Sequence, residues 1–60
     1  MKFTNCKEGI YLGANKWKGG YACGDWLIVE EAEEWIVYFV YQRVGAFDTK
    51  RAAETFCERF

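Results

Sequence analysis

The strongest pattern in the chain is the run from Trp35 to Val44, WIVYFVYQRV, in which both alternating sets of positions are largely apolar. Its aromatic and β-branched residues favour a strand. A strand that is apolar on both faces needs cover on two sides. The remaining chain is short, so we expect one covered face and one face that is available to a partner.

A second apolar run, Trp26 to Glu30, precedes the first, and the polar segment Glu31 to Glu34 separates the two. The pair predicts an antiparallel hairpin with a four-residue loop, in which Glu30 pairs with Trp35. One face of this hairpin would then carry Trp26, Ile28, Trp35, Val37 and Phe39, and the other Leu27, Val29, Ile36, Tyr38 and Val40. Because both sets are apolar, alternation alone does not identify the inner face.

Asp48 to Phe60 predicts a helix, in which Asp48 or Thr49 accepts hydrogen bonds from first-turn amides. Its apolar residues form one stripe, made of Ala52, Ala53, Phe56, Cys57 and Phe60. We expect this stripe to pack against the hairpin face that carries Trp26, Ile28, Trp35, Val37 and Phe39.

The first third of the chain has weaker patterns. Lys2 to Glu8 alternates moderately and predicts a first strand, which Ile10 to Leu12 extends or follows, while Lys16-Trp17-Lys18 fits a strand or a loop. Gly and Asn at 13–15 and 19–20 indicate turns. The predicted fold is a single α+β domain over residues 1–60, an antiparallel sheet of about three strands packed by one C-terminal helix.

A domain of 60 residues buries only about 60% of the surface of its unfolded chain, which leaves a marginal core. Three Trp, four Tyr and five Phe supply large apolar surfaces with few rotatable bonds. Small cores of this kind commonly rely on association for part of their stability. We therefore expect a protein partner or a homodimer.

The residue inventory excludes several classes of function. The chain contains no Ser, His or Pro, which rules out Ser-His triads, histidine bases and histidine metal sites. No cofactor, metal or small-molecule substrate is indicated, so we expect no enzyme. The start of the chain lacks the apolar run of a signal peptide, and no run is long enough to span a bilayer, so we expect a cytoplasmic location without membrane contact.

Three cysteines, Cys6, Cys23 and Cys57, form an odd set without CxxC spacing. They are best interpreted as small buried hydrophobic residues. A disulfide between Cys6 and Cys23 is the alternative.

The leading candidate site is the outward strip of the hairpin, Leu27, Val29, Ile36, Tyr38, Val40 and Gln42. An apolar patch rimmed by charge commonly marks an interaction surface. The alternative, to which we give equal weight, is that the N-terminal segment folds over the strip through Phe3, Ile10, Tyr11, Leu12 and Trp17.

The hairpin tip gathers four carboxylates, Glu30, Glu31, Glu33 and Glu34. Glu31, Glu33 and Glu34 would steer the strip toward a basic partner. A hard cation such as Ca²⁺ or Mg²⁺ is a further possible ligand. A solvated turn is favoured over the cation, because no Asp-rich loop with a central Gly accompanies the cluster.

The segment Gly45 to Thr49, followed by Ala52-Ala53 and Phe56, resembles the strand-to-helix junction of ethylene-response-factor DNA-binding domains and of arm-binding domains of phage and transposon integrases. The resemblance implies three antiparallel strands with one packed helix, and DNA binding as the alternative function. The analogous DNA-contacting side chains would be Arg43, Lys16, Lys18 and Trp17. Net charge is −1 and the hairpin tip is acidic, so nucleic acid is the less favoured partner.

We therefore predict a small non-catalytic protein-interaction module that acts through its sheet face. Its size, acidic balance and apolar sheet are similar in style to small phage or mobile-element proteins that bind and inhibit a host defence protein. The partner-binding residues are predicted to be Leu27, Val29, Ile36, Tyr38, Val40, Gln42, Glu31, Glu33 and Glu34.

Overall fold

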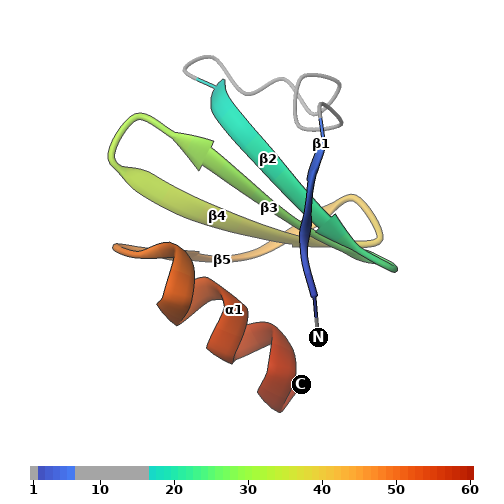
Figure 1. Ribbon diagram of the computed structural model, residues 1–60. Helices are drawn as coiled ribbons and strands as arrows, with labels where there is room; N and C mark the ends of the chain where they lie inside the picture. The colour runs from blue at the N-terminus through green and yellow to red at the C-terminus, as the bar shows by residue number, and fades with distance from the viewer. Residues whose placement is uncertain (1, 7–16) are drawn as a thin grey trace.

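A computed structural model describes residues 2–6 and 17–60 of the chain. The elements follow in the order β1 (Thr4–Cys6), β2 (Trp17–Cys23), β3 (Trp26–Glu31), β4 (Glu34–Phe39), β5 (Gln42–Phe47) and α1 (Lys50–Arg59). The strands form one antiparallel sheet in the order β1-β2-β3-β4-β5, and α1 packs against it (Figure 1). Every strand therefore pairs with its neighbours in sequence.

The predicted class, an antiparallel sheet packed by one C-terminal helix, is confirmed, but the sheet has five strands rather than about three. The expected single strand from Trp35 to Val44 is wrong, because the chain reverses at Val40-Tyr41 between β4 and β5. Both turn residues have positive φ, 49° at Val40 and 64° at Tyr41. Tight turns of this kind normally contain Asn, Asp or Gly, so the apolar run conceals the turn.

The N-terminal strands are also only partly predicted. The expected strand over Lys2 to Glu8 corresponds to the shorter β1, and β2 begins at Trp17. Ile10 to Leu12 and Lys16 lie outside the described residues.

The register of the central hairpin matches the prediction. Glu30 pairs with Trp35, and the pairs Ile28–Val37 and Trp26–Phe39 follow from it. The loop is shorter than expected, because Glu31 also pairs with Glu34. The turn therefore consists of Ala32 and Glu33, with a positive φ of 56° at Ala32.

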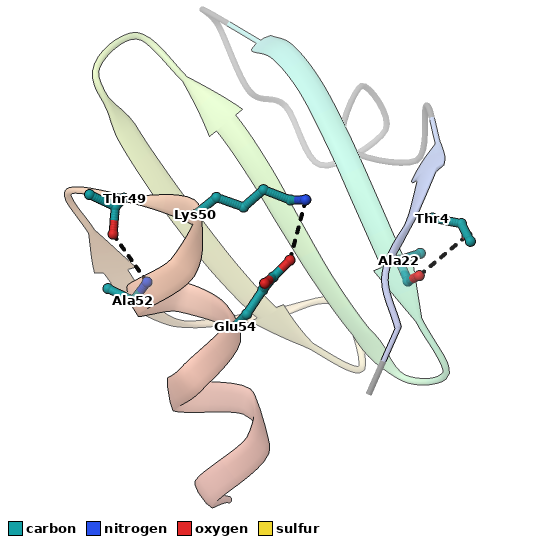
Figure 2. A network of polar contacts seen from close by, with 6 residues as sticks. All are labelled: Thr4, Ala22, Thr49, Lys50, Ala52 and Glu54. Atoms are coloured by element: carbon teal, nitrogen blue, oxygen red, sulfur yellow. Dashed lines mark hydrogen bonds and ion pairs between the residues drawn. The ribbon is translucent and has the colours of Figure 1, made fainter.

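The helix begins later than predicted, at Lys50, because Thr49 caps it. The Thr49 hydroxyl oxygen accepts a hydrogen bond from the amide of Ala52 at 3.1 Å (Figure 2). This bond satisfies one of the amides that a helix start leaves without a partner. In the described part of the chain, no helix has the length and apolar character that crossing a membrane requires.

The core lies between α1 and the sheet face that was predicted to meet it. Ile28 and Val37 of the sheet are buried together with Ala53 and Cys57 of the helix. The partly buried side chains around this cluster are Phe3, Trp26, Trp35, Phe47 and Phe56. The helical stripe is narrower than expected, since Ala52 and Phe60 are exposed.

Lys50 connects the start of α1 to the sheet through its contact with Tyr21 of β2. Its Nζ lies 3.3 Å from a carboxylate oxygen of Glu54 (Figure 2). The same Nζ lies 4.2 Å from the ring centroid of Tyr21. Tyr21 belongs to β2, and its ring lies 6.1 Å from that of Trp35. One cation thus links the helix to an aromatic pair on the sheet.

Candidate functional site

The structure buries the middle of the predicted outward strip. Leu27, Val29 and Ile36 are 3%, 0% and 3% exposed, so they offer no surface to a partner in this conformation. Tyr38 is half-buried, whereas Val40 and Gln42 are exposed. The expectation of an open strip is thus corrected for these three residues. Both faces of β3 and β4 are therefore covered, as a strand pair that is apolar on both sides requires.

The alternative, in which the N-terminal segment covers the strip, does not hold for Phe3. Phe3 packs against the cluster of Ile28, Val37, Ala53 and Cys57, which lies on the opposite, helix-facing side of the sheet. Ile10, Tyr11 and Leu12 lie outside the described residues, as does the side chain of Trp17.

The predicted acidic tip lies at the β3–β4 turn. Glu33 and Glu34 are exposed, Glu31 is half-buried, and Glu31 stands directly opposite Glu34 in the ladder. Like charges in this position weaken a hairpin. Within residues 2–6 and 17–60, no three His, Cys, Asp or Glu residues are grouped so that they could hold a metal ion. At the tip, Glu33 and Glu34 thus face solvent.

An exposed apolar surface lies at the other end of β4, and of its residues Val40 was predicted from the sequence to bind a partner. Its exposed members are Phe39 (41%), Val40 (53%), Tyr41 (66%), Val44 (42%) and Phe60 (80%). We call these five residues the hairpin–helix patch. Four come from the β4–β5 hairpin, and Phe60 follows the last residue of α1.

Part of the patch forms a groove. Trp26, Phe39, Val44 and Phe60 line a cavity of about 210 Å³. The ring of Trp26 lies 4.6 Å from that of Phe39 and 5.9 Å from that of Phe60. These distances are typical of packed aromatic pairs, which hold one another in place. The groove is therefore apolar and formed before any partner arrives.

A β-bulge in β5 supplies one wall of this groove. Val37 pairs with Gly45 and Tyr38 pairs with Arg43, so Val44 has no partner on β4. A bulge changes the direction of the side chain that it carries. Here Val44 lines the groove together with Phe39, a helix-side residue of β4.

The turn within the patch has a strained backbone. Positive φ is rare for a β-branched residue such as Val40 and costs roughly 1–2 kcal/mol for each residue other than glycine. The amide of Val40 donates a hydrogen bond to the carbonyl of Asp25 at 3.0 Å, which fastens this turn to the β2–β3 turn. Strain that the surroundings hold in place concentrates at functional sites.

The three cysteines form no disulfide, and the thiol of Cys57 is buried. All three are free, and Cys6 pairs with Gly20, three positions along β2 from Cys23, so the alternative of a Cys6–Cys23 disulfide does not hold. Burial raises the pKa of Cys57 to about 11, and the neighbouring Glu54 carboxylate adds to the rise. A thiol that stays protonated at neutral pH is a poor nucleophile.

No protein-family model, curated protein or solved structure matches this chain in the comparisons made. A function for the protein must therefore be inferred from its surface. One sequence signal pointed toward that surface: Phe39, Val40 and Tyr41 continue an apolar run without any polar residue at the place where the chain turns.

Proposed function

We propose that this protein is a non-catalytic interaction module that binds a protein partner through the hairpin–helix patch. The observation that carries the proposal is the exposure of five large apolar side chains, three of which, Phe39, Val44 and Phe60, line one groove with Trp26. Isolated exposed hydrophobic residues are ordinary, whereas a clustered patch with a groove is typical of an interaction site. Aromatic residues are also enriched where proteins meet.

The patch has the physical properties of a preorganised binding surface. Trp26 forms part of the groove and is held by its neighbours, so little side-chain entropy remains to be lost when a partner docks. Tyr41 and Phe60 are the most exposed members, and side chains of this size are frequent anchors in protein interfaces. We expect these two residues to contribute most of the binding free energy.

The predicted steering by the acidic tip acts weakly on this patch. The tip and the patch lie at opposite ends of β4, a strand of six residues that spans roughly 20 Å. At physiological ionic strength charges are screened over about 8 Å. Glu33 and Glu34 would therefore steer a partner only if it also contacts their end of the sheet. Asp25, whose carbonyl accepts the hydrogen bond from the Val40 amide, and Arg43, next to Val44 in the chain, lie beside the patch and take over that role in the proposal.

Inhibition of a host defence protein is the narrower form of this proposal and is motivated by size and composition alone. DNA binding of the integrase-arm type gains no specific support from the residues that the structure describes: of its candidate contacts, Arg43 is exposed, and Lys16 and the side chains of Trp17 and Lys18 lie outside those residues. Those domains have three strands, whereas this sheet has five. In addition, Leu27, Val29 and Ile36 have no exposed surface to place on DNA.

The proposal is tested with patch variants that keep the fold. Phe60→Asp and Val44→Asp each place a charge on the patch, and both positions are exposed enough to accept it without unfolding. Immobilised wild-type protein should retain a partner from a lysate of the native cells, and both variants should lose at least about nine-tenths of it, equivalent to about 1.4 kcal/mol. Circular dichroism should remain that of the wild type.

The matched control is Thr55→Asp, which introduces the same charge at an exposed position of α1 outside the patch. This variant should retain the partner as the wild type does. Equal capture by folded Phe60→Asp, Val44→Asp and Thr55→Asp would refute the patch as the binding surface.

A further inference from the structure

The last strand of the sheet presents a free edge to one side. Within the described residues, β5 pairs with β4 alone and ends the strand order. Most of its residues are exposed, with Gly45 and Phe47 half-buried. The backbone groups along such an edge are a ready template for another strand. The question is which strand the edge accepts.

We propose that β5 pairs antiparallel with β5 of a second copy, which gives a twofold-symmetric dimer with one continuous sheet. A twofold interface uses the same surface on both chains. The side chains of β5 should therefore be complementary to themselves when the strand is reversed.

The charges at the two ends of β5 have this self-complementarity. Arg43 is exposed near the start of the strand, and Asp48 is exposed immediately after its end. Antiparallel pairing brings Arg43 of each copy near Asp48 of the other, so two attractive pairs form. Parallel pairing would instead place like charges side by side. The charge pattern therefore favours the antiparallel arrangement.

The bulge fixes a register that also matches the faces of the sheet. In a regular strand, residues 43 and 46 would point to opposite faces. The bulge at Val44 changes this: Arg43 pairs with Tyr38 and Ala46 pairs with Ile36, so Arg43 and Ala46 lie on the same face of the sheet. If Arg43 of one copy pairs with Ala46 of the other, the corresponding faces of the two sheets form one continuous face in the dimer. Asp48 is then the diagonal neighbour of Arg43, a distance that a long side chain spans.

The size of the domain gives a thermodynamic reason for this association. A 60-residue chain has a marginal core, and pairing adds buried surface and backbone hydrogen bonds at the same time. Val44 belongs both to β5 and to the patch, and the proposed register places Tyr41 opposite Asp48 of the other copy. Phe60 lies outside β5, after α1, so Phe60→Asp tests partner binding apart from the edge.

The test measures molecular mass by analytical ultracentrifugation over a range of protein concentrations. Wild-type protein should associate to a dimer. Arg43→Glu and Asp48→Arg should each be predominantly monomeric, because each creates two like-charge contacts. The dimer dissociation constant should rise by about ten- to a hundredfold. Arg51→Glu, the same charge reversal at an exposed position of α1, should leave it unchanged.

Two rescue experiments establish the geometry. The double variant Arg43→Glu/Asp48→Arg should dimerise again, since the attractive pairs are restored with reversed signs. An equimolar mixture of the two single variants should form a heterodimer. In a parallel arrangement like charges would already face each other in the wild type, so neither single reversal would weaken the dimer.

The proposal is overturned if wild-type protein is monomeric up to millimolar concentration, if Arg43→Glu dimerises like the wild type, or if the double variant stays monomeric. These results differ from a failure of the proposed function, which is read from Phe60→Asp. Loss of the dimer in Phe60→Asp but not in Arg43→Glu would assign self-association to the patch and would also contradict the edge pairing.

Discussion

Replacing Val40 and Tyr41 with Asn and Gly is expected to make the protein more stable and a weaker binder. Both residues have positive φ, where the natural pair is strained and Asn-Gly is the preferred pair for a two-residue hairpin turn. At roughly 1–2 kcal/mol for each position, with Gly removing the cost fully and Asn only in part, the relief of strain is worth roughly 2–3 kcal/mol in total. The substitution therefore acts on the strained turn without requiring a change in the strand register.

The loss of apolar contacts offsets part of this gain. The two side chains are already 53% and 66% exposed, so the burial that they lose is worth only about 1–1.5 kcal/mol. The net increase in the free energy of unfolding is then about 1 kcal/mol. For a domain of this size, such an increase raises the melting temperature by roughly 4–8 °C.

Urea and thermal unfolding followed by circular dichroism measure this change, and partner capture is measured on the same preparation. The matched control is Ala32→Gly in the β3–β4 turn, where φ is also positive at 56°. This control should gain up to about 1 kcal/mol and keep its binding. A less stable Val40→Asn/Tyr41→Gly variant, or a stabilised variant with undiminished binding, would refute the link between strain and function at this turn.

Three further results follow from the structure. Burial raises the pKa of Cys57 from 9.0 to about 11, so the thiol of the unfolded chain ionises at lower pH than that of the folded protein. The free energy of unfolding should therefore fall between pH 9 and 11. Urea titrations at several pH values should show a smaller fall for Cys57→Ala. Gly24→Ala should cost about 1 kcal/mol of stability through strain alone, because φ is +60° there while no atom lies within 4 Å of the added methyl; no loss in thermal unfolding would contradict the turn conformation. Lys50→Met should lower the free energy of unfolding by about 1 kcal/mol, because its cation no longer contacts Tyr21; Arg51→Met, at an exposed neighbouring position, should have no measurable effect.

The sequence predicted the parts of the fold in which local pattern and packing agree. The register of Trp26 to Phe39 followed from alternation, and the helix followed from its apolar stripe and its cap. In the same way, Ile28 and Val37 were correctly assigned to the face that meets the helix. These features depend on period and composition, which can be read without tertiary information.

The turn at Val40-Tyr41 could not be predicted, because neither residue carries a turn signal and tertiary contacts impose their backbone conformation. The missed turn had two consequences. The apolar run was assigned to one long strand instead of two, and the exposed patch at its tip was not recognised. The burial of Val29 was also missed, because both alternating sets of residues in this hairpin are apolar and alternation does not show which face is covered.

The most direct test of the central claim is site-specific photo-crosslinking in the native cells. A photoreactive phenylalanine analogue in place of Tyr41 should form a covalent adduct with another protein, and adding Phe60→Asp should abolish that adduct. The same analogue in place of Glu33, exposed at the opposite end of the sheet, should form none. No adduct from position 41, or equal adducts from both positions, would contradict the assignment of the hairpin–helix patch as the binding surface.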